Sequence, residues 1–432
     1  MNELILIVYT TLYRKGGDKF EKVAHTMKCE KEASGNEVLC LPTESKQALK
    51  DVFNELIAKG SKIKEFHFIG HSGMYGPMFG QVAYPEQFSP YELKLLQIPF
   101  AENGEAFFHC CRSARWFAPY LAKEQNVTTY GYHWYTTFST RKDRYQRVNS
   151  WSDTTTLYCF GSPGRKSHGL LASFKKFTGR MQPEEMKVFT PGEQEDRSYN
   201  EVAALYANTF VDITVRTDEY QFIKKSLPHN PGTVLDIGCG NGALLRSISP
   251  FIGRGIGVDV SENLLNYAKD SNVHDAKLSF QQIDGPALPF EDNQFDVVIS
   301  LLSFRYLDWD PMMAEIERVL KPEGRLIIVD MVTAPVLARE WPQLLLSKFK
   351  HYRDRYRYPQ FYQNLQKLVS HPGWKKMLHH NPIRSQHEMK WYLESRFPGR
   401  KVKVINVGMH SRILAFNSGN MKDVKQIELT YP

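Results

Sequence analysis

The chain has 432 residues, 42% of them hydrophobic and 24% charged, with a formal net charge of +8. This length exceeds one ordinary hydrophobic core, so two domains of roughly 150–250 residues are expected. The composition excludes a disordered chain, and no apolar run reaches the roughly 18–20 residues that cross a bilayer. We therefore expect a cytoplasmic protein with no membrane partner. The modest positive charge permits nucleic acid as a partner without requiring it.

The cysteines and the first residues indicate a reducing compartment and a buried first strand. Six cysteines form no disulfide framework in so long a chain, and the neighbours Cys110 and Cys111 cannot easily pair with each other. No C-x-x-C pair or compact histidine–cysteine cluster has the spacing of a familiar metal site, so no metal is expected. The opening run MNELILIVYTTLYRKGG lacks the early positive charge and the cleavage site of a signal peptide.

The first half of the chain alternates strand-like apolar runs with segments of helix length. Strands that alternate with helices predict a mainly parallel sheet covered by helices on both faces. The expected helices are 18–33, 45–60 and 114–126, and the expected strands are 4–11, 36–42, 64–73, 105–113, 127–138 and 154–162.

Two adjacent cysteines end one of these strands, and a histidine ends the strand before it. Neighbouring strand residues point to opposite faces, so we predict that Cys110 packs in the core while Cys111 faces His71. A thiol beside an imidazole can ionise near neutral pH and attack a carbonyl carbon. Cys111 and His71 are therefore the candidate nucleophile and base of a cysteine hydrolase.

The run HCCRS, with a histidine forty residues before Cys111 (111 − 71), resembles the caspase-like cysteine peptidases, the group that includes gingipains and CHAT-type proteases. The resemblance implies a caspase-like α/β sandwich with Cys111 as nucleophile and His71 as base. The chain departs from the family pattern at Ser72 and Ser113, where the family has glycine beside its oxyanion hole. Two other interpretations remain open. GHSGM approaches a serine-hydrolase elbow with Ser72 as nucleophile, or the cysteines and His71 are packing residues of a structural domain.

Linker-like composition separates the two halves. The segments GSPGRKSHG and VFTPGEQEDRS carry the glycine, proline and charge that are typical of linkers. We place the first domain at 1–190, a linker at 191–198 and the second domain at 199–432. The segment 198–215 is predicted to be an entry helix.

The second domain opens with a glycine-rich turn between a strand and a helix, VLDIGCGNGALL. Glycines at 238, 240 and 242 let the backbone turn sharply and approach a ligand closely. Asp259 ends the next strand, where a carboxylate commonly binds ribose hydroxyls. The pattern G-x-G-x-x-A alone also fits a dinucleotide site. Asp236 precedes the loop, where it can accept hydrogen bonds from a cationic amine, and Asp284 follows a third strand.

With the helix, Lys-Pro-x-Gly turn and strand at 312–331, these features resemble the class I S-adenosylmethionine-dependent methyltransferases over 234–331. The resemblance implies a Rossmann-like seven-stranded fold, closed by a hairpin over 401–419, and S-adenosylmethionine as cofactor. Asp236 and the loop would hold the methionine end, Asp259 the ribose, Ile283 and Asp284 the adenine. The implied cofactor residues are Asp236, Gly238, Cys239, Gly240, Asn241, Gly242, Asp259, Val260, Ile283, Asp284, Ser300 and Leu301.

The residues after the fourth strand leave the acceptor open. The run SLLSFRYL differs from the proline-rich motif of adenine and cytosine amino methyltransferases, and 333–397 stands where the family builds its acceptor lid. The tract Lys348–Gln363 interleaves bases and tyrosines; we prefer an amphipathic helix at a pocket edge to a single-stranded nucleic-acid site. Candidate bases for an acceptor proton are His351, His379, His380, Asp330 and Tyr306.

We therefore predict an α/β protein of two domains, in which a methyltransferase acts on a small-molecule or peptide acceptor. The first domain is expected to be a cysteine peptidase or a module that presents substrate. The alternatives are a cysteine peptidase whose methyltransferase-like half senses cofactor, and an RNA-modifying methyltransferase.

Overall fold

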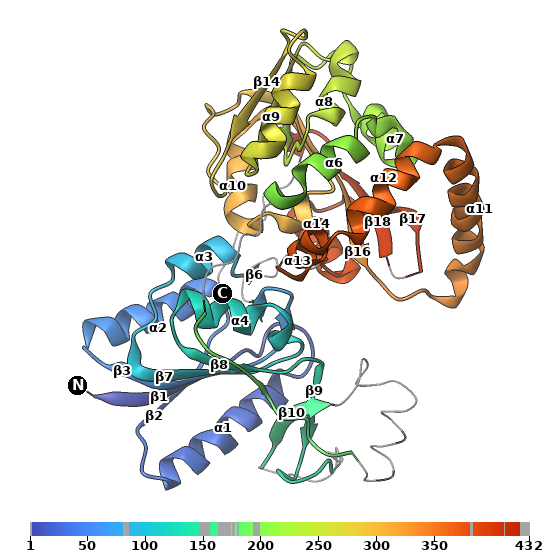
Figure 1. The fold of residues 1–432 in the computed structure, drawn as a ribbon. Helices are drawn as coiled ribbons and strands as arrows, with labels where there is room; N and C mark the ends of the chain where they lie inside the picture. The colour runs from blue at the N-terminus through green and yellow to red at the C-terminus, as the bar shows by residue number, and fades with distance from the viewer. Residues whose placement is uncertain are drawn as a thin grey trace. The chain divides into compact units, whose positions relative to one another are not determined.

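The computed structural model describes residues 2–80, 86–146, 156–162, 174, 178, 181–192, 199–380, 383–409 and 411–423. The chain divides into two compact units, Met1–Glu195 and Asp196–Glu428. Each unit is built around its own sheet, and both sheets are seen in Figure 1.

Among the described residues, the first unit contains a six-stranded sheet in the order β11-β8-β7-β3-β1-β2. All neighbours pair in parallel except β11, which runs antiparallel to β8 at one edge. The strands are β1 (Glu3–Tyr9), β2 (Val38–Pro42), β3 (Lys62–Ile69), β7 (Phe100–His109), β8 (Thr128–Gly131) and β11 (Lys187–Phe189). The sheet has parallel neighbours because helices connect its successive strands.

Helices cover both faces of this sheet, as the alternation of strand and helix segments predicted (Figure 1). Helix α1 (Gly17–Ala33) packs Phe20 and Val23 on one face. Helices α2 (Lys46–Ala58), α3 (Pro90–Leu95) and α4 (Phe117–Glu124) pack on the other. Each large apolar side chain that is fully buried in this way contributes about 1.5–3 kcal/mol.

The segment 127–138, predicted to be one strand, is divided between two sheets. After β8 the chain turns, and β9 (Tyr135–Ser139) pairs with β10 (Tyr158–Ser162) in a separate two-stranded sheet. A Cβ atom at Gly131 would lie 2.8 Å from the hydroxyl of Ser113, and the backbone of Arg112 donates to the carbonyl of Trp134. The turn after β7 thus draws this segment out of the main sheet. Three short strands, β4 (Ser72–Gly73), β5 (Gly76–Phe79) and β6 (Glu86–Gln87), form a further small sheet.

Among the described residues, the second unit contains a seven-stranded sheet in the order β14-β13-β12-β15-β16-β18-β17. Strands β12 to β16 are parallel, and β18 is antiparallel to both of its neighbours. The predicted closing hairpin is therefore confirmed. The strands are β12 (Thr233–Ile237), β13 (Arg254–Asp259), β14 (Leu278–Gln282), β15 (Phe295–Leu301), β16 (Leu320–Thr333), β17 (Lys403–Val407) and β18 (Ser411–Asn417).

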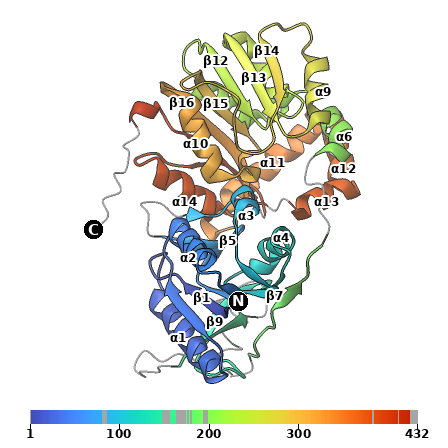
Figure 2. The ribbon, with the colours of Figure 1, turned by 90° about the vertical axis from the view of Figure 1, so that its left-hand side faces the viewer.

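Helices again lie on both faces of this sheet (Figure 2). Helices α7 (Thr217–Ser226) and α8 (Ala243–Ile248) pack on one face, and α10 (Trp309–Val319) and α14 (Gln386–Arg396) on the other. The remaining helices are α6 (Ala203–Thr209), α9 (Glu262–Ser271), α11 (Trp341–Arg357), α12 (Pro359–Ser370) and α13 (Pro372–His380). In the described part of the chain, no helix combines the length and the apolar content needed to span a bilayer.

Two predicted elements of the second unit differ from the structure. The Lys-Pro-Glu-Gly turn lies inside the long strand β16, where the pairing with β15 shifts register between Phe295 and Val297. Over its described residues 199–215, the predicted entry helix 198–215 is broken into α6 and two 3₁₀ turns, because the Asp212 side chain accepts from the amide of Thr214 and starts a new turn.

Candidate functional site

The loop between β12 and α8 requires glycine at the positions that turn it. Gly238 and Gly242 have φ angles of +75° and +71°. A Cβ atom at Gly238 would lie 2.4 Å from Cβ of Ser303, and one at Gly242 would lie 2.7 Å from the ring of Phe280. The amide of Gly238 also donates to the carbonyl of Val258 at 2.8 Å. The loop is thus fixed between β13 and β15 with its backbone free of side chains.

A buried carboxyl group lies directly before this loop. Asp236, on β12, is 1% exposed, and its Oδ1 atom has no hydrogen-bond partner among the described residues. Burial, with the charge of Asp259 as a second cause, raises the pKa of Asp236 to about 8. A buried carboxylate without a partner costs free energy that a cationic ligand group can offset.

The second acid, Asp259, holds the loop from the end of β13. Its Oδ2 atom accepts the amide of Gly240 at 2.9 Å, and its Oδ1 atom accepts the amide of Ser261 at 2.9 Å. Burial raises the pKa of Asp259, while these backbone hydrogen bonds act to lower it. Ser261, rather than Asp259, caps α9, because its hydroxyl accepts the amide of Leu264.

The remaining predicted cofactor residues differ in their placement. Ile283 is buried and its amide donates to the carbonyl of Asp259 at 3.1 Å, whereas Asp284 and Val260 are exposed. The side-chain amide of Asn241 donates to the carbonyls of Ala207 and Phe210, so it fastens α6 to the loop.

Cys239 and the end of β15 complete the wall of the loop. Cys239 is buried, and its backbone amide donates to the carbonyl of Val258, which suits a packing residue. Ser300 is buried and shares a 2.8 Å hydrogen bond with Ser303, which donates to the carbonyl of Ile237 at 2.7 Å. Leu301, beside Ser300, ends the strand and is partly buried.

Strained backbone marks the end of β15. Leu302 has a φ angle of +59°, a left-handed conformation that a branched residue rarely adopts, and its amide donates to the carbonyl of Val329 at 2.7 Å. Such strain costs about 1–3 kcal/mol and clusters at ligand sites. The sequence contained no signal for it.

An aromatic cluster that the sequence analysis missed borders the loop. A Cβ atom at Gly240 would lie 3.2 Å from the ring of Tyr206. The ring of Tyr199 lies 5.4 Å from that of Tyr206, 6.1 Å from Tyr306 and 5.8 Å from Trp374. Burial raises the pKa of Tyr206 to about 12, so this hydroxyl stays protonated at neutral pH. Tyr199 and Tyr206 were the sequence features from which this cluster could have been predicted.

The candidate bases fall into distinct environments. Asp330 is buried and forms an ion pair with the guanidinium of Arg305, whose backbone amide it also accepts, so it is engaged in holding Arg305. His351 lies on α11, with its ring 5.1 Å from that of Tyr362. The side chains of His379 and His380 lie outside the described residues. Of the candidate bases whose side chains the structure describes, Tyr306 alone lies in the aromatic cluster.

In the first unit, β3 and β7 are neighbours, with Ile69 paired to His109, so His71 and Cys111 follow adjacent strand ends. His71 Nε2 donates to the carbonyl of Lys15 at 3.1 Å, and burial lowers its pKa. Cys111 Sγ lies 3.3 Å from the hydroxyl of Thr136 and accepts the Thr136 amide. Among the described residues, no hydrogen bond joins the imidazole and the thiol.

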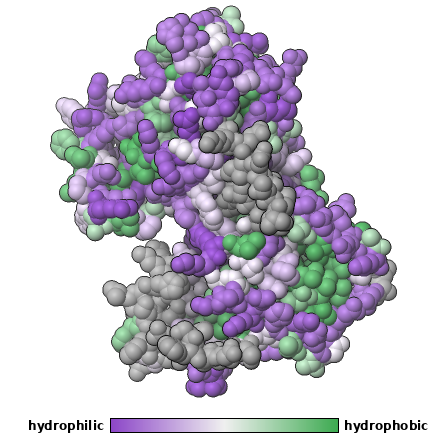
Figure 3. Space-filling view, turned by 180° about the vertical axis from the view of Figure 1, so that it is seen from behind, coloured by the Kyte–Doolittle hydropathy of each residue, from purple (hydrophilic) through white to green (hydrophobic). Residues whose placement is uncertain are grey.

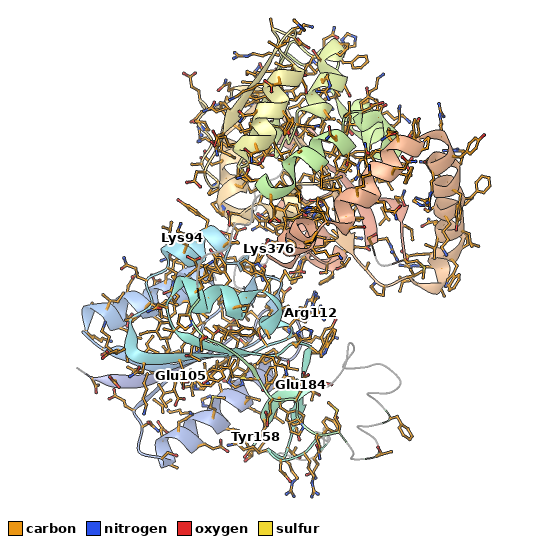
Figure 4. All side chains as sticks on the ribbon, in the orientation of Figure 1. Lys94, Glu105, Arg112, Tyr158, Glu184 and Lys376 are labelled. Carbon is orange, nitrogen blue, oxygen red and sulfur yellow. The ribbon has the colours of Figure 1, made fainter. Side chains whose placement is uncertain are left out.

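Cys110 and Ser72, the residues next to Cys111 and His71 in the chain, lie in different environments. Cys110 lies in the core among the residues of α2 and α4, which confirms its predicted packing role, and burial raises its pKa to about 12. Figure 4 labels Glu105 on β7 and Arg112 just beyond the end of that strand. Ser72 donates to the carbonyl of Cys111 and is followed by strand β5 instead of a helix, so the serine-hydrolase interpretation is wrong.

A buried polar chain on the same face as Cys111 was also missed. His67 Nε2 lies 2.8 Å from a carboxylate oxygen of Glu65, and its Nδ1 lies 3.2 Å from Nε2 of His109. Lys31 completes the chain with an ion pair to Glu65. Burial lowers the pKa of both histidines. Within the described residues, no group of three histidine, cysteine or acidic side chains is arranged to hold a metal ion.

Comparison with known proteins gives matches in the second unit. Residues 235–328 match the family model for a methyltransferase domain. The chain is 30% identical over 169 residues to the uncharacterized methyltransferase YcgJ of Bacillus subtilis, covering 38% of this chain and 62% of that protein. It is 40% identical over 105 residues to a demethylmenaquinone methyltransferase of Lactococcus lactis, covering 23% and 41%.

A solved S-adenosylmethionine-dependent methyltransferase from Aquifex aeolicus is 19% identical, with a TM-score of 0.34 over 52% of this chain and 99% of that one. The chain spans 62% of the Bacillus protein and 41% of the Lactococcus protein, so less than two thirds of either relative is matched. The residues matched by the family model include the glycine loop, both buried acids and β15.

Proposed function

From a second unit that contains a class I S-adenosylmethionine-dependent methyltransferase domain, we propose that this chain transfers a methyl group to a small-molecule or peptide acceptor. The observation that carries the proposal is the buried Oδ1 atom of Asp236, which has no hydrogen-bond partner among the described residues and lies beside a loop of left-handed glycines. This combination suits a ligand that is cationic at one end and that must approach backbone amides closely.

S-adenosylmethionine is the cofactor of this domain class, and the residues of the site fit it. Asp236 would hold the cationic amine, the backbone of 238–242 would line the methionine end, and Asp259 would hold the ribose. Ile283 and Asp284 would flank the adenine. The bound cofactor supplies an electrophilic methyl group, so the protein's task is to position the acceptor.

The aromatic cluster supports a role in acceptor positioning. Tyr206 covers the loop at Gly240, and Tyr199 links it to Tyr306 and Trp374. Under this proposal, the rings would exclude water from the place where the methyl group is transferred. Arg305, held by Asp330 and lying 4.4 Å from the Tyr306 ring centroid, fixes the position of that tyrosine.

Calorimetric titration with S-adenosylmethionine and then with NAD tests the cofactor, and formation of S-adenosylhomocysteine with small-molecule, peptide and RNA acceptors tests the reaction. We expect binding of S-adenosylmethionine alone, weakened at least about tenfold by Asp236→Ala. The control Asp270→Ala removes an exposed acid on α9 and should bind normally. Preference for NAD would contradict the proposed cofactor. Cofactor binding without methyl transfer would favour the alternative in which the second unit only senses the cofactor. Methyl transfer to RNA alone would favour an RNA-modifying methyltransferase.

We propose a cysteine peptidase as a second candidate function, for the first unit. The adjacency of β3 and β7, which places His71 and Cys111 at neighbouring strand ends, favours it. His71 would have to leave the carbonyl of Lys15 to serve as the base. Cleavage of a peptide library that is lost in Cys111→Ala and kept in Cys29→Ala, which alters an exposed cysteine, would support this function. Equal cleavage by both variants would contradict it.

A further inference from the structure

Helix α11 exposes a stripe of large apolar side chains. Trp341, Leu345, Phe349, Tyr352 and Tyr356 are 58%, 61%, 73%, 69% and 91% exposed. Their spacing of four, four, three and four residues places all five on one face of the helix. In the view from behind, hydrophobic groups on this flank of the second unit are set among hydrophilic ones (Figure 3). An exposed apolar face of this size marks an interaction surface.

The opposite face of α11 attaches the helix to its unit through mainly polar contacts. Lys350 forms an ion pair with Asp218 of α7, and Asp354 is buried beside Arg353. Of the apolar residues on the helix, Leu344 alone is buried. An ordinary surface helix turns its apolar side chains inward, so the reversed arrangement of α11 indicates an apolar partner outside the unit.

The charges of α11 indicate what kind of partner this is. The helix carries five lysines and arginines and one acid, and that acid is buried. Lys348 and Arg355 flank the stripe on one side and Arg353 on the other, and all three are exposed. A partner that takes up the stripe must therefore be apolar inside and anionic at its surface.

We propose that α11 lies flat on an anionic lipid bilayer, with its aromatic stripe among the headgroups and its basic residues on the lipid phosphates. Tryptophan and tyrosine concentrate at the membrane–water interface, and a basic helix with an apolar face binds there. The expectation of no membrane partner rested on the lack of a spanning segment. A helix in the plane of the interface requires none.

The same features disfavour two other occupants. Single-stranded nucleic acid binds aromatic platforms within a basic groove. Of the five stripe residues, Tyr352 lines the groove that α11 forms with α7 and α12, whereas Trp341, Leu345, Phe349 and Tyr356 are not among the residues that line it. A second copy would pair two strongly basic helices along their flanks, which repel each other.

Flotation of the full chain with vesicles tests the proposal. We expect binding to vesicles of phosphatidylcholine and phosphatidylglycerol in equal parts, and at least about tenfold weaker binding to phosphatidylcholine alone or at high salt. The double variant Leu345→Ser/Phe349→Ser should bind the anionic vesicles at least about tenfold more weakly. The matched control Val211→Ser/Val273→Ser removes two equally exposed apolar side chains elsewhere on the unit and should bind normally.

Several results would overturn the proposal. One is a failure of the native chain to float with anionic vesicles, and another is equal flotation of the stripe variant and the native chain. A dimer or a complex with single-stranded RNA that the stripe variant loses, with no vesicle binding by the native chain, would assign α11 to that partner instead. Unchanged thermal unfolding and S-adenosylmethionine affinity show that the variant is folded, so flotation can be compared directly.

Discussion

The carboxyl ends of the two sheets hold reactive side chains whose hydrogen bonding differs. In the second unit, Asp236 Oδ1 is buried without a partner among the described residues. In the first unit, His71 donates to Lys15 and Cys111 bonds with Thr136. A bound cation offsets the cost of an unpaired buried carboxylate, whereas a satisfied group must first give up its partner. The hydrogen bonding around a side chain therefore indicates a preformed ligand site better than its identity does.

The largest expected effect is a loss of stability of the cofactor-free second unit as the pH rises from about 4 to about 8. The pKa of Asp236 is raised to about 8 by burial and by Asp259, while the unfolded chain releases this proton near pH 4. The folded state therefore binds one more proton than the unfolded state across this window, and each pH unit costs at most about 1.4 kcal/mol. Hydrogen exchange of β12 peptides at several pH values measures the change.

Asp236→Asn should flatten this pH dependence, because an amide fills the same space without a titrating proton. Asp270→Asn, at an exposed position on α9, should leave the slope unchanged. If the slope persists in the Asp236 variant, other buried groups cause it, and the contrast between the two units does not rest on Asp236.

The next largest effect concerns the glycine loop 238–242. Gly238→Ala should destabilise the second unit by about 2–4 kcal/mol. The new Cβ would clash with Ser303, and residue 238 would have to keep a left-handed backbone conformation that alanine disfavours. Gly399→Ala is the matched control, since Gly399 has a φ of +82° and a Cβ added there would have no atom within 4 Å. It should cost about 1–2 kcal/mol through the backbone alone. Thermal unfolding of both variants separates crowding from conformational strain, and equal costs would contradict a tightly packed loop.

The first unit should respond to pH in the opposite direction. Burial lowers the pKa of His67 and His109, so the unfolded chain binds more protons as the pH falls below about 6.5. Stability should therefore fall by about 1–3 kcal/mol between pH 6.5 and pH 5. Hydrogen exchange of β3 and β7 peptides measures this loss of stability at low pH. His109→Gln keeps a polar partner for His67 without titrating and should reduce the loss, and a loss of the same size in that variant would point to other groups.

The alternation of strands and helices and the glycine loop were predictable from sequence, because they depend on local periodicity and on residues with special backbone freedom. The acids at the strand ends were predictable for the same reason. The buried state of Asp236, however, depends on strands that lie on either side of it in the sheet. The sequence contains no direct signal for that environment.

The failures of prediction arose from tertiary contacts between distant residues. Gly131 turns the chain away because the turn at Ser113 lies against it, which divided a predicted strand between two sheets. The bond of His71 to Lys15, which joins residues 56 positions apart, was likewise not predictable from the sequence, and it leaves the role of His71 a prediction. The tract Lys348–Gln363, interpreted as one amphipathic helix, is divided between α11 and α12. Which face of α11 turns outward depends on Asp218 of another helix.

The smallest expected effect tests the satisfied thiol of the first unit. Thr136→Val removes the hydroxyl that contacts Cys111 Sγ at 3.3 Å and keeps the backbone amide, so stability should fall by about 1 kcal/mol or less. The freed thiol should then be alkylated by iodoacetamide severalfold faster, with the exposed Cys29 as the internal reference for reagent activity. An unchanged rate at Cys111 would show that the hydroxyl does not restrain the thiol. The Cys111 thiol would then be more available for reaction than its hydrogen bonds indicate, and the contrast with Asp236 would be weaker.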